Sequence, residues 1–412
     1  MLPNRPTLDQ LQNAFANRQI AEGYLLLADA LRWLRRNSRN EPPSTNLLLT
    51  TALWVDVGYP DDGLLDELVL RFVPSFRRDM PLSSYLELRL VEAWRAMSRE
   101  EEDTAIRLLE FVLNAQKEFS DSNVSLFAHY FKARAHRKKG EYEPALADTL
   151  EARRHAQELG LEKFGAVIQI QEAWLLFQKG KTKDAVRSFD EAEQQLRHTD
   201  DYLSLANIES ARGRIVRRAG EYHRALKYYE NAIAIYSSHY PQHRNLARTL
   251  INAAYVKRLL ALQLRKRIDR KMTIGTRKQP SNNGSHHARY LRICQEALGD
   301  LEQAGEIYAL HDHHGGTGSA LVNAGYLHLD QGSVDRAAAK SFKAYEHAHR
   351  NNDHILMARA RILESSIENV RVDEQLSEEG DLAVHANTAK VHAEDAVALA
   401  THTQNRRLLA GA

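Results

Sequence analysis

Apolar and small residues recur along this chain with a period of about 40 residues. Glycines at 140, 180 and 220 mark three equivalent turns, and the same residue types surround each of them. A small residue precedes each glycine, and two alanines with a larger residue between them follow it. In chain order these positions hold Ala133, Ala145, Thr149 and Ala152, then Ala173, Ala185, Phe189 and Ala192, and then Gly213, Ala225, Tyr229 and Ala232. The pattern predicts helices in antiparallel pairs, with a tight turn at each glycine.

Each residue type has a physical role in such a pair of helices. Glycine accepts the left-handed conformation that ends a helix, which a β-carbon resists. Small residues let the paired helices approach closely, and the larger residue fills the space between neighbouring pairs. The order of small residue, glycine turn, alanine, bulky residue and alanine resembles the tetratricopeptide repeat (TPR). This resemblance implies an all-α fold, a right-handed superhelical solenoid of antiparallel helix pairs, and it specifies function poorly.

The spacing of the glycines is longer than the roughly 34 residues usual for this repeat. We therefore expect longer helices, as in the repeat arrays of bacterial signalling and transcription regulators. TPR-like repeats are expected over 84–262 and 290–412, with Glu100 replacing the turn glycine in the first of them. Residues 1–83 are expected to form a helical cap or degenerate repeats. The segment 404–412 resembles the beginning of another helix, so we expect the sequence to be truncated at its C-terminal end.

Composition supports a helical protein of a reducing compartment. The 412 residues include 20 glycines and 10 prolines, too few for the many tight turns of an all-β protein. The single cysteine, Cys294, excludes an intramolecular disulfide and a cysteine-based zinc site. The sequence has neither the pattern of a signal peptide nor an apolar run long enough to cross a bilayer, so we expect a cytoplasmic protein. The net charge of +2 gives no global attraction to a polyanion.

Three short motifs could carry chemistry, and each has a simpler structural explanation. The residues His-Asp-His-His at 311–314 are adjacent and cannot all face one ion, so we expect a polar loop. The glycine-rich segment 315–319 lacks the lysine of a phosphate-binding loop, and Thr317 or Ser319 is expected to cap the following helix. Cys294 lies on a predicted helix without catalytic partners. We therefore predict no metal, no cofactor, no catalytic residue and no enzymatic activity.

The first helix of each pair lines a concave groove in TPR arrays, and the turn glycines set the register of its residues. Arginines three residues apart share one face of a helix, and an arginine can hold a carboxylate bidentately. We predict a groove for an acidic and apolar peptide or protein, formed by Tyr130, Arg134, Arg137, Trp174, Asn207, Arg214, Arg217 and Lys257. The alternative is that the arginines pair with glutamates of adjacent helices and that Trp174 belongs to the core.

A basic segment at 263–289 interrupts the repeats and is expected to be a flexible insertion, because its middle part is rich in Gly, Pro, Asn and Ser. Contact with phosphate groups would use Arg265, Lys266, Arg267, Arg270, Lys271, Arg277 and Lys278. Only Tyr290 is available nearby to stack on a base, which makes nucleic-acid binding the weaker alternative.

Three functions from different classes therefore remain. The favoured one is a scaffold that binds a protein or peptide in the groove. The second is the sensor half of a bacterial transcription or signalling regulator, whose output domain lies beyond residue 412. The third is a repeat protein that binds nucleic acid through the basic insertion. The sequence leaves the identity of the partner and the oligomeric state open.

Overall fold

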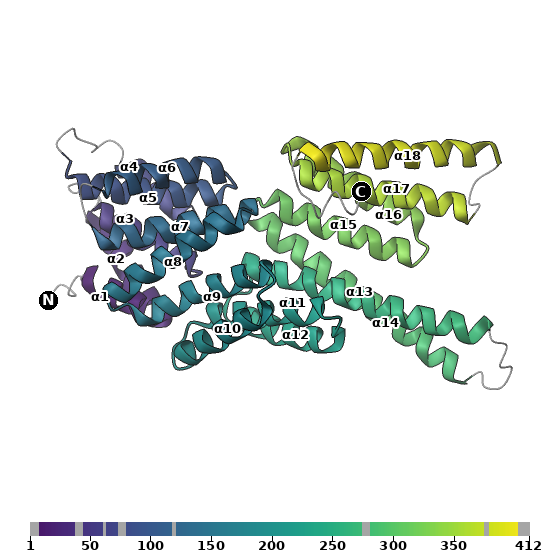
Figure 1. The fold of residues 1–412 in the computed structure, drawn as a ribbon, viewed down its shortest axis with the longest axis horizontal. Helices are drawn as coiled ribbons and strands as arrows, with labels where there is room; N and C mark the ends of the chain where they lie inside the picture. Colours follow the sequence, from purple (N-terminus) through teal and green to yellow (C-terminus); the bar gives the residue numbers. More distant parts are fainter. Residues whose placement is uncertain are drawn as a thin grey trace. The chain divides into compact units, whose positions relative to one another are not determined.

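The structure is a computed structural model that describes residues 8–37, 44–60, 63–72, 80–117, 121–273, 281–374 and 379–402. Over these residues the regular elements are helices, numbered as in Figure 1. The chain divides into two compact units, Met1–Ala211 and Arg212–Ala412, here called unit 1 and unit 2. The predicted all-α fold is confirmed.

Unit 1 begins with four helices and continues with three helix pairs. The ten helices described in it are α1 (Leu8–Ala16), α2 (Ile20–Asn37), α3 (Thr45–Asp56), α4 (Leu64–Phe72), α5 (Leu82–Ser98), α6 (Glu102–Ala115), α7 (Ser122–Lys139), α8 (Tyr142–Glu158), α9 (Glu162–Gln178) and α10 (Thr182–Leu196). The pairs α5/α6, α7/α8 and α9/α10 each pack side by side in opposite directions (Figure 1). The next helix, α11 (Tyr202–Arg218), runs from unit 1 into unit 2.

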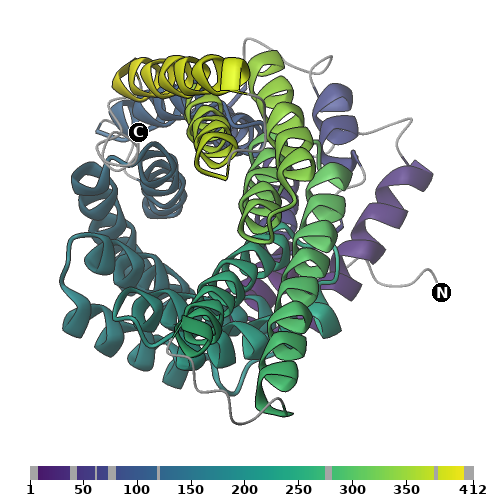
Figure 2. The same ribbon diagram turned by 90° about the vertical axis from the view of Figure 1, so that its right-hand side faces the viewer.

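Unit 2 continues the same alternation of first and second helices. Its remaining described helices are α12 (Tyr222–His239), α13 (Arg244–Thr273), α14 (Ser281–Leu310), α15 (His314–Asp330), α16 (Val334–Arg350), α17 (His354–Asp373) and α18 (Glu379–His402). The pairs α13/α14, α15/α16 and α17/α18 pack closely, and Figures 1 and 2 both show α13 and α14 running alongside each other. Antiparallel helix pairs are thus present in both units, as the repeat pattern predicted.

First helices of successive pairs contact one another as well as their own partners. In unit 1, α3 contacts α5 and α5 contacts α7; in unit 2, α13 contacts α15 and α15 contacts α17. Each unit therefore has a surface lined by first helices, here called its first-helix face. This is the surface to which the sequence assigned the predicted groove residues.

The repeat positions pack as their residue types predicted. The alanines at 133, 145, 152, 173, 185, 192, 225 and 232 are fully buried, and so are the larger residues Thr149, Phe189 and Tyr229. Gly213 stands where the two earlier repeats have alanine, and a β-carbon there would lie 2.6 Å from Cε1 of Tyr229. The glycine therefore makes room for the largest of the three residues at the bulky position.

The turns between paired helices adopt the left-handed conformation. The φ angles are 82° at Gly140, 83° at Gly180, 82° at Gly220 and 74° at Gly332. Glu100, at the equivalent position one repeat before Gly140, has a φ of 65°. The turn geometry is thus kept even where the glycine is absent, at the expense of a strained backbone.

The predicted insertion at 263–289 consists largely of helix ends. Helix α13 continues to Thr273 and α14 begins at Ser281, so both contain 30 residues where α15 contains 17. Residues 274–280 lie outside the described residues. The expectation of a flexible loop is therefore wrong for 263–273 and for 281–289, because helix-forming sequence extends α13 at its end and α14 at its start.

The start of α15 also differs from the prediction. His313 precedes the helix, and its Nδ1 accepts a hydrogen bond from the backbone N–H of Gly316 at 2.9 Å. The predicted caps Thr317 and Ser319 lie inside the helix, which begins at His314 despite its two early glycines. None of the described helices combines the length and apolar character that crossing a bilayer requires.

Candidate binding site

The first-helix face of unit 1 is covered by the chain's own helix α1. This helix packs against α3 and α9, and its Phe15 is buried. The ring of Phe15 lies 5.6 Å from that of Trp54 on α3, 6.2 Å from Phe127 on α7 and 5.1 Å from Phe164 on α9. The predicted groove residue Tyr130 is buried against Phe164 at 5.3 Å, and its burial raises its pKa. Tyr130 is therefore part of the core, a place that the alternative interpretation gave to Trp174.

A buried ion pair holds α1 in this position. Nε of Arg18, in the turn after α1, donates to Oδ2 of Asp201 at 2.7 Å, and both side chains are almost completely buried. The neighbouring Asp200 accepts from the backbone N–H groups of Ile20 and Ala21 at 2.6 and 2.7 Å, which places a carboxylate at the positive end of α2. These contacts join segments that lie far apart in the sequence.

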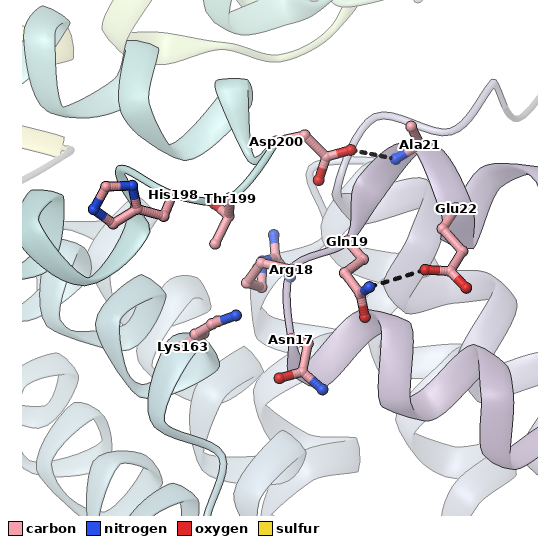
Figure 3. Close-up of a pocket in the computed structure, with 9 residues that line it drawn as sticks. All are labelled: Asn17, Arg18, Gln19, Ala21, Glu22, Lys163, His198, Thr199 and Asp200. Atoms are coloured by element: carbon pink, nitrogen blue, oxygen red, sulfur yellow. Dashed lines mark hydrogen bonds between the residues drawn. The ribbon is translucent and has the colours of Figure 1, made fainter.

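A shallow recess of about 560 Å³ opens beside this turn (Figure 3). Its lining includes Lys163 at the start of α9 and Asp200, and Figure 3 shows the Asp200 carboxylate turned towards the N–H of Ala21. The polar groups of the recess are thus partly engaged in fixing the turn. We assign no ligand to it.

Two predicted groove arginines of unit 1 contact other side chains of the chain itself. Nη1 of Arg134 donates to Oδ2 of Asp56 on α3 at 2.5 Å. Burial opposes the charge of Arg134, but Asp56 outweighs it, so the pKa of the guanidinium lies above its usual range. Arg137 lies over the half-buried ring of Trp174, with the guanidinium carbon 5.3 Å from the ring centre. The alternative that the groove arginines find partners in neighbouring helices therefore holds for Arg134, although the partner is an aspartate.

Arg214 of unit 2 has a different environment. It is half-buried, and among the described residues no carboxylate forms an ion pair with it. Burial, together with the charges of Arg248 and Arg217, lowers the pKa of Arg214 to about 10, while Tyr229 and Tyr236 act in the opposite direction. Arginines remain protonated at neutral pH even so. The first-helix face of unit 2 therefore carries a desolvated positive charge that no described carboxylate balances.

Other side chains of unit 2 extend this basic and aromatic surface. Nη1 of Arg217 donates weakly to Oδ1 of Asn252 at 3.4 Å, and its guanidinium carbon lies 5.2 Å from the ring centre of Tyr255. Arg359 on α17 is half-buried and donates to Oγ of Ser319 on α15 at 3.1 Å, and its burial lowers its pKa. Sequence reasoning missed Arg359, although it occupies the same place in its helix as Ser319 does one repeat earlier.

The last two predicted groove residues are placed less favourably for a ligand. Nζ of Lys257 donates to Oδ2 of Asp300 on α14 at 2.7 Å, and both side chains are largely buried. Burial raises the pKa of Asp300, which the bond to Lys257 opposes. Lys257 therefore stabilises the α13/α14 pair. Asn207 is half-buried on α11 and already has an interaction partner.

The predicted phosphate-binding residues are only partly described. Arg265, Lys266 and Arg267 are exposed on α13, and Nη1 of Arg265 donates to the main-chain oxygen of Asp330 at the C-terminal end of α15. Arg270 and Lys271 belong to the last turns of α13. Arg277 and Lys278 lie outside the described residues.

The histidine-rich segment at 311–314 and Cys294, for which the sequence analysis favoured structural roles, both make contacts within the fold. Nε2 of His311 is 2.7 Å from the main-chain oxygen of Gln242, and His313 caps α15 while its ring packs 4.9 Å from that of Tyr308. Cys294 is buried, and burial raises the pKa of its thiol. A buried, protonated thiol is unreactive.

No protein-family model matches the chain, and no curated protein matches it. Many solved structures do. One is IFIT1, as a monomeric mutant with Gppp-AAAA: the TM-score is 0.56, the identity is 14%, and the match covers 98% of this chain and 82% of that chain. A Rap protein complexed with competence and sporulation factor gives a TM-score of 0.52 at 12% identity, covering 92% of this chain and 98% of that one.

A third structure is a signal-transduction ATPase of the STAND class with a tetratricopeptide repeat sensor, from Pyrococcus horikoshii. Its TM-score is 0.51 at 12% identity, and the match covers 94% of this chain and 55% of that one. At these identities the likeness concerns the fold alone. The chain has a TPR-like helical repeat fold, as the resemblance in the sequence implied.

Proposed function

We propose that this chain is a binding protein, not an enzyme, and that it holds an acidic segment of a protein or peptide on the first-helix face of unit 2. The observation that carries the proposal is Arg214, a half-buried cation without a carboxylate partner among the described residues. A carboxylate from a ligand would restore the favourable electrostatics that burial removes. Arg217, Arg248 and the ring of Tyr255 provide further charge and contact area.

The similar structures support a binding function of this class. One of them is a Rap protein in complex with competence and sporulation factor, and another contains a TPR sensor. The ligand and the sensor belong to those proteins. By likeness of fold, they favour a role in ligand recognition for this chain, either as a scaffold or as the sensor half of a regulator.

The first test measures binding of defined peptides by fluorescence anisotropy. Labelled peptides of equal length would carry several, one or no Asp and Glu among apolar residues. We expect the acidic and apolar peptides to bind most tightly, with an affinity that falls as salt is added. Arg214→Gln should weaken this binding about tenfold or more, because a charge-assisted hydrogen bond is lost. Arg224→Gln serves as the matched control, since Arg224 is exposed on α12.

Stability measurements on Arg214→Gln and on Arg134→Gln separate effects on binding from effects on folding. Arg214→Gln should raise the urea midpoint, because it removes a desolvated charge that no described carboxylate balances. Arg134→Gln should lower the midpoint, because it leaves the carboxylate of Asp56 without its arginine. Equal binding of acidic and neutral peptides, or unchanged affinity in Arg214→Gln, would contradict the proposal.

Nucleic acid is the alternative ligand and forms a second arm of the test. The IFIT1 structure contains Gppp-AAAA, and arginines bind phosphate as readily as carboxylate. A single-stranded RNA oligonucleotide that binds tightly, with loss of affinity after neutralisation of Arg265, Lys266 and Arg267, would replace the peptide proposal.

A further inference from the structure

The helix pair α7/α8 brings three metal-binding side chains together in unit 1. One potential ligand atom from each of His129, Glu151 and His155 lies within 4.8 Å of the other two. Glu151 and His155 are four residues apart on α8 and so share one face of that helix, while His129 faces them from α7. We propose that these three residues bind a divalent transition-metal ion such as Zn²⁺.

The ligand set matches known zinc chemistry. Two imidazoles and one carboxylate form a three-ligand site that leaves one position open for water or another group. Bonds of about 2.0–2.1 Å in a tetrahedral arrangement require ligand atoms about 3.3 Å apart. The present separation of up to 4.8 Å would have to shorten by about 1.5 Å, through rotation of the side chains, to reach this geometry. Glu151 has room for such a rotation, because it is about half exposed.

A second carboxylate orients the first histidine. Nδ1 of His129 lies 2.8 Å from Oδ1 of Asp148, which is largely buried one turn before Glu151. When Asp148 accepts the Nδ1–H, the Nε2 atom of His129 is left as the metal-binding nitrogen. A carboxylate behind a ligating histidine is the usual support of a zinc site.

The other histidine is held in place and only partly satisfied. The rings of His129 and His155 are nearly parallel, at 19°, with their centres 6.0 Å apart. Nδ1 of His155 is buried and makes no hydrogen bond, although Oε2 of Glu158 is 3.3 Å away. A buried polar nitrogen without a hydrogen bond destabilises the fold. A metal ion bound to Nδ1 of His155 would remove this cost.

A neighbouring arginine competes for the same ligands. Nε and Nη2 of Arg154 both donate to Oε2 of Glu151, at 3.1 and 2.9 Å, and Nη2 lies 3.2 Å from Nε2 of His155. Arg154 is about half exposed, so it can move into solvent. Metal binding must displace this cation from Glu151. Removing Arg154 should therefore strengthen metal binding, a consequence that a purely structural role of the cluster does not predict.

The test titrates the full chain with ZnCl₂ by calorimetry, after treatment with a chelator and desalting. Visible absorption of Co²⁺ as a substitute reports the coordination geometry. We expect one Zn²⁺ per chain and tetrahedral Co²⁺ bands. His155→Gln and His129→Gln should each abolish this site, while the exposed His223 on α12 serves as the control in His223→Gln. Asp148→Asn should weaken binding about 10- to 100-fold.

Arg154→Gln keeps the site testable even where a histidine variant folds poorly, because Arg154 lies on the surface. This variant should bind Zn²⁺ more tightly than the wild type, with unchanged helical circular dichroism. Two results would overturn the proposal. One is the absence of stoichiometric Zn²⁺ binding in the wild type and in Arg154→Gln. The other is equal binding by the wild type, His129→Gln and His155→Gln, which would place the ion at other histidines.

Discussion

At the scale of single residues, the repeat pattern in the sequence is enough to identify the turn at residue 100. Glu100 occupies the position of the glycines that end the other first helices, and it keeps their left-handed conformation with a φ of 65°. A residue with a β-carbon is destabilised by roughly 1–2 kcal/mol in that conformation. The sequence can therefore predict where the backbone is strained.

The first prediction concerns this turn. Glu100→Gly should be more stable than Glu100→Ala by about 1 kcal/mol, because both lose the carboxylate and only glycine relieves the strain. The urea midpoint of each variant measures the difference. Gly140→Ala provides the reverse experiment and should destabilise the chain by a similar amount, since no neighbour within 4 Å obstructs a β-carbon there. Equal midpoints for the two Glu100 variants would refute the assignment of strain.

At the scale of helices, the repeat pattern predicted the turns that join the paired helices from α7 to α12 and which of their residues are buried. It did not predict where α1 packs. The small residues of the repeat specify which faces of neighbouring helices meet, because each contact joins residues close in the chain. The contact between Arg18 and Asp201 joins residues 183 positions apart, and neither residue belongs to a recurring pattern. Tyr130, which the sequence assigned to the groove, is likewise buried, with its ring packed against that of Phe164 on α9.

The second prediction concerns the hold on α1. Arg18→Ala leaves Asp201 buried without its cation and should destabilise the docked α1 by about 3–5 kcal/mol. Hydrogen exchange of the amides in α1 would then accelerate far more than that of α13. The double variant Arg18→Ala with Asp201→Ala should cost less than the sum of the two single variants. Additive effects would mean that the ion pair does not act as a unit.

At the scale of the whole molecule, the buried apolar residues form several clusters and not a single core. In unit 1 a continuous cluster of buried apolar residues extends from Leu11 on α1 to Ile168 on α9, and the buried Phe189 and Leu196 on α10 lie outside it. Unit 2 has separate clusters, including one around Leu363 and another around Cys294. The sequence predicted helical repeats in both units, but not how their buried residues divide into clusters.

The third prediction follows from these separate clusters. Leu363→Ala removes a fully buried side chain of α17 and should cost about 2–5 kcal/mol. Because repeat arrays lose structure locally, hydrogen exchange should accelerate in α15 to α18 and remain nearly unchanged in α5 to α8. Leu86→Ala, in the core of unit 1, should accelerate hydrogen exchange in α5 to α8 and leave α15 to α18 nearly unchanged. Uniform acceleration along the chain in either variant would show that the molecule unfolds as a single cooperative body.

The docked helix α1 would compete with any external molecule for the aromatic surface that it covers. An external molecule that uses the aromatic surface under Phe15 can bind only those copies of the chain in which α1 has left that surface. Its apparent dissociation constant therefore equals the intrinsic value divided by the open fraction. If about one copy in a hundred is open, affinity falls about a hundredfold. Changes that loosen Arg18 from Asp201 would then strengthen binding without adding any contact to the bound molecule.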